Sequence, residues 1–330
     1  MPPSITRRRL GLALGAAASL APLSALRAQP AQGLDMLKVL TGFPPGGTLD
    51  ALARKVADKL RGGYATSALV ENKPGAGGQL AILALRDSPA DGSTMLLTPS
   101  SMLSIYPYTY TRLQYRLDDV APVSLAAHFN HALAVGSAVP ESVKNIKDLL
   151  NWARAHPESA SCGSPGAGSM PHMILALLAR ASGVELRHIP YRGVVQGLQE
   201  TIGGQLSAFC SPVGDYLPHV KTGKARVLGV SGQTRSVFLP DVPTLREQGF
   251  DITVREWYGF FMPAKTRPEL LQRAAQHVQP ALAQADVIEH GRQFGLEVHG
   301  SSAPQLQELL AADAAEWKSI IQQIGFKADV

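Results

Sequence analysis

The sequence predicts an α/β protein whose chain forms two lobes joined by two extended crossings. Strand-like and helix-like segments alternate between residues 36 and 97 and again after residue 132. Two extended stretches, residues 123–135 and 252–262, separate a middle block of such units from the rest of the chain. A chain that leaves one lobe, builds a second and then returns places a cleft between the two.

Before the first of these units, residues 1–32 have the three-part pattern of an export signal. Three arginines at residues 7–9 precede an apolar run at residues 10–23, and small residues follow. The arginines are compatible with a twin-arginine signal as well as with the ordinary secretory route. Because the apolar run is shorter than the roughly 20 residues of a membrane span, we expect cleavage between about residues 28 and 33 and a periplasmic protein.

Removal of residues 1–28 changes the formal charge from +5 to +1, because four arginines and no acidic residue are lost. A nearly neutral surface without a long basic cluster does not favour nucleic acid as a partner. The histidines and cysteines show no metal-binding spacing, so we expect neither a metal nor a cofactor. Cys162 and Cys210 lie in strand-like runs, where a disulfide and two packed thiols are both open interpretations. We expect a monomer.

The first lobe is predicted from residues 33–128 and 254–330, beginning with a βαβαβ order that is typical of a doubly wound, mainly parallel sheet. Thr48 occupies the position of a helix N-cap, and Gly325 ends the last helix. The strands are expected at residues 36–41, 67–70 and 94–97, and the helices at residues 49–60, 79–86, 268–283 and 304–324.

The second lobe is predicted from residues 129–253, where the same alternation indicates a second mainly parallel sheet. Its strands are expected at residues 132–135, 160–163, 186–190, 206–210 and 226–230, and its helices at residues 143–155, 169–181 and 194–202. In both lobes the loops that follow the strands gather at the carboxyl edge of the sheet, where ligands of open α/β sheets bind.

A glycine-rich turn between the first strand and the first helix is the first candidate site. Glycine allows close backbone approach, and the unpaired N–H groups of a helix start can hold a carboxylate without any arginine or lysine. An ordinary βα turn with a capped helix explains the same residues equally well. The residues concerned are Phe43, Pro45, Gly46, Gly47, Thr48 and Asp50.

A second glycine-rich turn, residues 163–169, has the same setting in the other lobe. It contains G-x-x-x-x-G, but Ser169 occupies the position where a phosphate-binding loop has lysine, so a nucleotide is not favoured. Backbone N–H groups around Gly166, with the hydroxyls of Ser164 and Ser169, can hold a ligand oxygen instead.

Three further side chains follow strands of the second lobe. Tyr191 and Arg192 are expected to face the cleft, where Arg192 can pair with a distal acid group of a ligand or form a surface ion pair. Asp215 can accept a hydrogen bond from a ligand amine or cap the next helix.

An exported serine hydrolase is the alternative from another functional class. Ser164 or Ser169, His172 and Asp215 supply the residue types of a catalytic triad. However, the sequence around Ser164 lacks the leading glycine of a nucleophile elbow, and His172 follows Ser169 on the same helix. We therefore expect a binding protein rather than an enzyme, with His172 bracing the second loop.

Taken together, the motifs resemble those of the solute receptors of tripartite tricarboxylate transporters, also called Bug proteins. The resemblance covers nearly all of the predicted mature chain and depends on the order and spacing of several weak motifs. They are the segments at residues 43–54, 70–78, 89–94, 163–172, 190–193, 203–205 and 239–244.

This resemblance implies a two-lobed periplasmic binding protein fold of type II that closes on a small carboxylate, such as an organic acid or an amino acid. The carboxylate would be held by the two glycine-rich loops, including His172, and the cleft would also be lined by Thr98, Ser100 and Ser101. A membrane transporter or, in an orphan receptor, a sensor protein would be supplied by other chains. Thr41, Gly42 and Cys162 depart from the family pattern, which leaves the ligand open.

Overall fold

The computed structural model describes residues 34–328, and the predicted export signal lies outside them. The strands are β1 (Leu34–Thr41), β2 (Ala65–Asn72), β3 (Thr94–Pro99), β4 (Val120–Phe129), β5 (His131–Val135), β6 (Ser161–Ser164), β7 (Arg187–Pro190), β8 (Ala208–Pro212), β9 (Arg226–Val230), β10 (Glu256–Pro263) and β11 (Glu297–Val298). The helices are α1 (Thr48–Leu60), α2 (Gln79–Arg86), α3 (Ser101–Ser104), α4 (Tyr106–Thr109), α5 (Ile146–Ala155), α6 (Met170–Ser182), α7 (Val194–Ile202), α8 (Val213–Lys221), α9 (Pro268–Leu282), α10 (Ala285–Gln293) and α11 (Ala303–Ile324).

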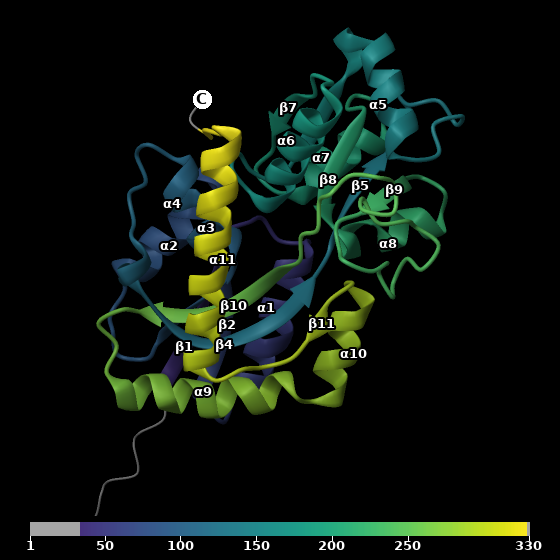
Figure 1. Cartoon of the computed structure of the whole chain (residues 1–330). Helices are drawn as coiled ribbons and strands as arrows, with labels where there is room; N and C mark the ends of the chain where they lie inside the picture. The colour runs from purple at the N-terminus through teal and green to yellow at the C-terminus, as the bar shows by residue number, and fades with distance from the viewer. Residues whose placement is uncertain (1–33, 329–330) are drawn as a thin grey trace, which may run out of the picture. The chain divides into compact units, whose positions relative to one another are not determined.

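Two separate sheets form the centres of the two lobes (Figure 1). The six-stranded sheet has the order β11-β4-β10-β3-β1-β2, and the five-stranded sheet has the order β7-β6-β8-β5-β9. The six-stranded sheet and its helices are called the first lobe, and the five-stranded sheet and its helices are called the second lobe. The lobe limits predicted at residues 128/129 and 253/254 stay a prediction.

Both sheets are mixed, whereas the sequence predicted mainly parallel ones. Strand β1 pairs in parallel with β2 and β3, and β6 pairs in parallel with β7 and β8, as βαβ units require. The crossing strands run the other way: β10 is antiparallel to β3 and β4, and β5 is antiparallel to β8 and β9. The prediction was wrong on this point because periodicity identifies a strand without giving its direction in the sheet.

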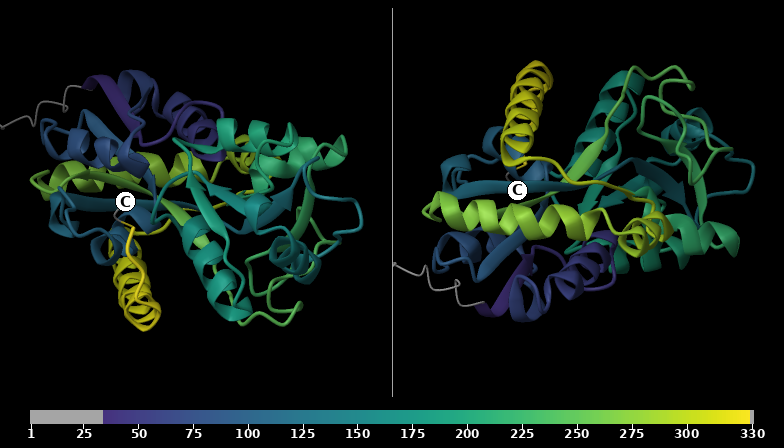
Figure 2. Two further views of the ribbon diagram at one scale, coloured as in Figure 1. Left: turned by 90° about the horizontal axis from the view of Figure 1, so that it is seen from above. Right: turned by 90° about the horizontal axis from the view of Figure 1, so that it is seen from below.

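Helices cover both faces of each sheet (Figure 2). In the first lobe α1, α9 and α10 pack on the face that carries Leu37 and Val39, whereas α2, α3 and α11 pack on the face that carries Leu40. In the second lobe α7 and α8 cover the face of Ala132 and Ala134, and α5 and α6 cover the opposite face. This alternation along the strands is the period of two that the sequence displays.

The chain passes between the lobes at the two predicted extended stretches. The first stretch forms two consecutive strands, β4 in the six-stranded sheet and β5 in the five-stranded sheet, and Asn130 lies between them. On the way back, residues 251–255 form no regular structure and lead into β10 (Figure 1). Both crossings therefore end close to the start of a strand, at His131 and at Glu256.

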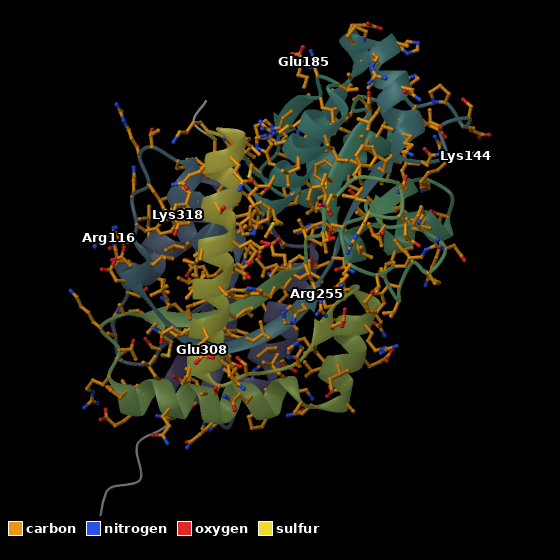
Figure 3. All side chains as sticks on the ribbon, in the orientation of Figure 1. Arg116, Lys144, Glu185, Arg255, Glu308 and Lys318 are labelled. Carbon is orange, nitrogen blue, oxygen red and sulfur yellow. The ribbon has the colours of Figure 1, made fainter. Side chains whose placement is uncertain are left out.

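Charged side chains of both signs lie on the outer surface of both lobes, as the labelled Arg116, Lys144 and Glu185 illustrate (Figure 3). None of the helices within residues 34–328 is both long enough and apolar enough to span a membrane.

Candidate functional site

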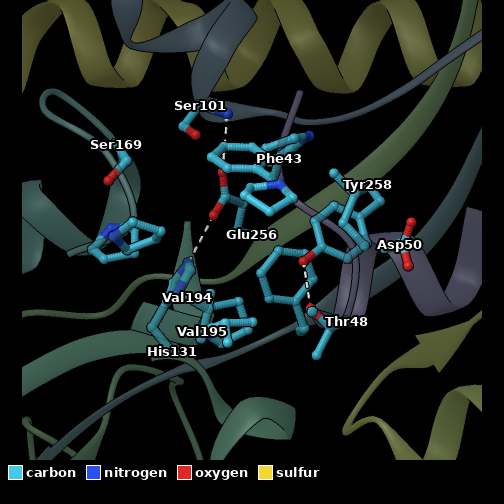
Figure 4. Close-up of a pocket in the computed structure, with 18 residues that line it drawn as sticks. Phe43, Thr48, Asp50, Ser101, His131, Ser169, Val194, Val195, Glu256 and Tyr258 are labelled. Atoms are coloured by element: carbon cyan, nitrogen blue, oxygen red, sulfur yellow. Dashed lines mark hydrogen bonds and ion pairs between the residues drawn. The ribbon is translucent and has the colours of Figure 1, made fainter. Parts of the chain in front are cut away.

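A pocket lies between the two lobes and is built from both (Figure 4). The first lobe contributes the turn between β1 and α1, the end of β3, Phe129 and the start of β10. The second lobe contributes the start of β5, the loop between β6 and α6, the start of α7 and the end of β8. The lining residues are Phe43, Pro44, Gly47, Thr48, Leu49, Asp50, Pro99, Ser101, Phe129, His131, Pro165, Ser169, Pro171, Val194, Val195, Pro212, Glu256 and Tyr258.

The two lobes touch each other on more than one side of this pocket. The backbone N–H of Thr48 donates to Oδ1 of Asp215 across 3.3 Å, and the hydroxyl of Tyr110 donates to the carbonyl of Ala167 across 2.8 Å. The ring of Phe326, which follows α11, meets the ring of His172 edge-on. The cleft is therefore in a closed arrangement.

The glycine-rich turn of the first lobe is organised around Asp50. Gly46, which has a positive φ of 101°, directs its N–H to Oδ2 of Asp50 across 3.2 Å. Arg54 donates to both oxygens of the same carboxylate at 2.9 Å, and Asn72 adds a further hydrogen bond at 2.9 Å. Burial opposes ionisation of Asp50, but these hydrogen bonds together hold its pKa below the ordinary value. The carboxylate of Asp50 thus uses one donor of the turn, the N–H of Gly46, together with side-chain donors from α1 and β2.

Thr48 is not the N-cap that the sequence predicted. Gly47 is the N-cap, and Thr48 is the first helical residue of α1. Its hydroxyl forms a 2.7 Å hydrogen bond with the hydroxyl of Tyr258 in the pocket wall (Figure 4). The prediction failed because the side chain finds a partner on β10, 210 residues away, in place of its own helix.

Asp215 lies in the first turn of α8, but its Oδ1 atom accepts a hydrogen bond from the start of α1 in the other lobe. A protein carboxylate therefore uses the helix N-terminus at which the sequence placed a ligand carboxylate. Burial raises the pKa of Asp215 to about 7, against the lowering effect of the N–H of Thr48. Among the described residues, its second oxygen is buried without a hydrogen-bond partner.

In the second loop, Ser169 is the N-cap of α6, yet its hydroxyl donates to the carbonyl of Gly166 across 2.7 Å. Nδ1 of His172 accepts from the N–H of Gly168 across 3.0 Å, so His172 braces the loop. Ser169 and Pro171 line the pocket, whereas Ser164, Gly166 and His172 do not.

A pair of stacked histidines lies behind this loop. The rings of His172 and His188 are 3.4 Å apart between centroids and nearly parallel. Burial lowers the pKa of His172 to about 3 and that of His188 to about 4, and for His172 the neighbouring His188 adds to the effect. Both rings are therefore neutral at ordinary pH.

The side chains of the hydrolase alternative do not assemble into a triad. The hydroxyl oxygen of Ser164 lies 2.8 Å from Nε2 of His188 and 3.0 Å from the carbonyl oxygen of Gly166. His172 is engaged with the backbone of its own loop, and Asp215 with the start of α1. No carboxylate orients His188 as a triad requires, judged by the hydrogen bonds of residues 34–328.

The most deeply buried polar contact of the pocket wall joins Glu256 and His131 (Figure 4). The Oε2 atom of Glu256 lies 2.7 Å from Nε2 of His131, and Oε1 accepts from the N–H of Ser101 across 3.0 Å. The two side chains are 2% and 1% exposed. Neither residue was expected in the site from the sequence, although a polar residue at the head of an otherwise apolar strand was a usable signal.

The remaining predicted site residues lie around the pocket without lining it. Thr98 and Ser100 are buried at the end of β3, and the hydroxyl of Ser100 has no partner among the described residues. Tyr191 and Arg192 lie with Gly166 in a separate groove at the cleft margin that also contains Arg112. Pro45 and Gly46 belong to the first turn but not to the pocket wall. Most of the apolar wall was not expected from the sequence either, because its residues look like ordinary core there; they include Leu49, Phe129, Val194 and Val195.

Cys162 and Cys210 are buried free thiols on β6 and β8. Within residues 34–328, no group of three or more histidine, cysteine and acidic side chains is arranged to hold a metal ion.

Comparison with known proteins identifies the family to which the chain is similar. Residues 52–326 match the model of the tripartite tricarboxylate transporter family receptor. A protein encoded in the tcbD-tcbE intergenic region of Pseudomonas sp. strain P51 is 31% identical over 333 residues, which cover 99% of this chain and 97% of the relative.

Two solved structures share the fold over most of the chain. The periplasmic binding protein BugD is 25% identical with a TM-score of 0.82, and the match covers 88% of this chain and 98% of BugD. The R. palustris protein Rpa4515, solved with adipate, is 26% identical with a TM-score of 0.83, again over 88% of this chain and 98% of the other.

Proposed function

This chain belongs to the tripartite tricarboxylate transporter receptor family, and we propose that it captures a small carboxylate in the periplasm and presents it to membrane components supplied by other chains. The observation that carries the proposal is the pocket between the lobes, to which both lobes contribute. A ligand bound there contacts both lobes at once, so it stabilises the closed form over the open one. A membrane partner can then distinguish the loaded receptor from the unloaded one.

The chemistry of the pocket supports a carboxylate ligand. The starts of α1 and α6 both face it, through Thr48 and Leu49 and through Ser169, and a helix N-terminus favours a negative group. Ser101, which is buried and carries a hydroxyl, also lines the pocket. The adipate in the R. palustris relative is a carboxylate as well.

The periplasmic location rests on the family and on the export pattern of residues 1–32. We propose that these residues are removed after export and that the mature protein is a monomer. The proposal does not depend on which export route is used.

The test is a thermal-shift and calorimetric screen of the protein purified from the periplasm against mono-, di- and tricarboxylates. A ligand present at one hundred times its Kd stabilises the folded protein by about 2.7 kcal/mol. For a chain of this size that corresponds to a rise in Tm of roughly 4 °C. Small-angle scattering should show a smaller radius of gyration with the same ligand than without it.

A screen in which no carboxylate changes the Tm or gives heat of binding would overturn the proposal. Turnover of ester substrates that disappears in Ser164→Ala would support the hydrolase instead. Deletion of the gene separates uptake from signalling: loss of growth on the bound acid indicates uptake, whereas altered gene expression with normal growth indicates a sensor partner.

A further inference from the structure

A groove at the margin of the cleft, here called the margin groove, is built from both lobes. None of the described residues that line it also lines the pocket. The first lobe contributes the loop before α2 and the segment after α4, and the second lobe contributes the loop after β6 and the residues that follow β7. The lining includes Gly77, Tyr110 and Arg112 from the first lobe and Gly166, Tyr191 and Arg192 from the second.

The two lobes touch each other inside the margin groove. The hydroxyl of Tyr110 donates to the carbonyl of Ala167 across 2.8 Å. The backbones also approach closely, since a Cβ atom at Gly166 would lie 3.3 Å from Cα of Gly77. Each of these contacts joins one lobe to the other, so the margin groove is assembled when the lobes close and is lost when they open.

The margin groove and the pocket share one short segment of the second lobe. Arg192 lines the margin groove, whereas Val194, two residues later, lines the pocket. Between them lies Gly193, where a Cβ atom would be 2.7 Å from Cδ of Pro44 in the first lobe. The position of Arg192 relative to the first lobe is therefore tied to closure of the pocket.

The margin groove is locally basic although the predicted mature chain is nearly neutral. Arg112 and Arg192 are both exposed, and no acidic residue is among the described residues of the lining. Neither arginine forms an ion pair within residues 34–328. Glu200, which does not line the groove, forms hydrogen bonds with the hydroxyl of Tyr191 and with Gln196. Closure thus brings one arginine from each lobe into a single groove.

This arrangement suits a segment of protein better than a free small anion. An exposed pair of one arginine and one carboxylate contributes little to binding, because both charges remain in water. A single small anion would therefore bind the margin groove weakly. A segment with several Asp or Glu side chains reaches both lobes at once, and each guanidinium can hold a carboxylate through two parallel hydrogen bonds. Such a segment binds the closed form in preference to the open form.

We propose that the margin groove is the docking surface for an acidic segment of the membrane partner, which recognises the loaded receptor through Arg112 and Arg192 together. The inference rests on the proposed function and adds to it the surface and the chemistry of the partner. It assigns the two arginines to the partner and not to the bound carboxylate.

The first measurement uses fluorescein-labelled hexaglutamate as the probe for the acidic segment. Its anisotropy should rise with the wild-type protein at low salt, and more so in the presence of the acid that gives the largest rise in Tm in the carboxylate screen. The double variant Arg112→Gln/Arg192→Gln should bind the peptide about fivefold more weakly. The matched control Arg116→Gln/Arg154→Gln removes one exposed arginine from each lobe outside the groove and should bind it like the wild type.

The second measurement separates docking from capture. A strain that lacks the gene is complemented with each variant, and uptake of the same acid, radiolabelled, is followed. The double variant should slow uptake about tenfold, because docking is weakened in both lobes, while its calorimetric Kd for the acid stays within about twofold of the wild type. The control variant should support normal uptake. If the partner is a sensor, the transcriptional response to the acid replaces uptake.

The outcomes distinguish this inference from the proposed function. Wild-type peptide binding or wild-type uptake in the double variant overturns the inference alone. A Kd for the acid that rises as much as uptake falls also overturns it, because the arginines would then serve the acid itself. Loss of uptake in a chain that ends at Ala328, equal to that in the double variant, would assign the groove to residues 329–330 instead. A wild-type protein that binds no carboxylate overturns both proposals.

Discussion

Replacement of Asp215 by asparagine should change the pH dependence of stability strongly. The folded pKa of about 7 compares with an ordinary value of 3.8. Between these two values the folded protein keeps a proton that the unfolded chain has lost. The free energy of unfolding of the wild type therefore falls as the pH rises from about 4 to about 7, and it is unaffected by this group above that range.

The magnitude follows from the size of the shift. A difference of about 3 pKa units corresponds to about 4 kcal/mol, an upper value because the contact lies between lobes that can open. Asparagine keeps an oxygen that accepts from the N–H of Thr48 but cannot titrate. The stability of Asp215→Asn relative to the wild type should therefore increase by up to about 4 kcal/mol between pH 4 and pH 8.

Urea unfolding of both proteins at pH 4, 6 and 8 measures this difference directly. Asp241→Asn, at an exposed aspartate of the same lobe, is the control and should show no such trend. A difference between Asp215→Asn and the wild type that stays constant from pH 4 to pH 8 would refute the reasoning, because burial of Asp215 would then not perturb its ionisation.

Three further predictions concern the second lobe. Burial lowers the pKa of His172 to about 3, so the free energy of unfolding should fall as the pH drops from about 6.5 towards 3. Urea titrations should show a smaller loss of this free energy between pH 7 and pH 4.5 in His172→Gln than in the wild type. A Cβ atom at Gly214 would lie 1.8 Å from the carbonyl oxygen of Phe294 in the other lobe, so Gly214→Ala should weaken ligand binding more than tenfold by calorimetry while its circular dichroism stays native. In Gly63→Ala the new Cβ atom would have its nearest neighbour 3.6 Å away, so this control variant should bind the ligand normally. If Gly214→Ala also binds with wild-type affinity, the close contact between Gly214 and Phe294 in the closed form is contradicted. Burial raises the pKa of the Cys162 thiol to about 12, so mass spectrometry should find it alkylated by iodoacetamide only after denaturation.

Much of the local structure could be predicted from the sequence, because it depends on short-range physics. Alternation with a period of two places Leu37 and Val39 on one face of β1, and glycine-rich turns after β1 and β6 lead directly into α1 and α6. The helix predicted at residues 304–324 is α11, Ala303–Ile324, with Gly325 in the left-handed conformation at its end. The extended stretches that lead from one lobe to the other were also visible in the apolar pattern.

Strand direction and the polar contacts of the cleft were decided only by the tertiary structure. Glu256 and His131 are 125 residues apart and meet because β10 and β5 begin where the chain crosses between the lobes. Asp215 reaches the start of α1 from 167 residues away and takes the donor that the sequence assigned to a ligand.

Such contacts depend on which strands lie side by side and on how far the lobes close, and neither is encoded in the neighbours of a residue. The sequence by itself determined that two helix starts face a cleft. The tertiary structure decided that the carboxylate of Asp215 uses one donor at the start of α1, and that Glu256 and His131 meet in the pocket wall.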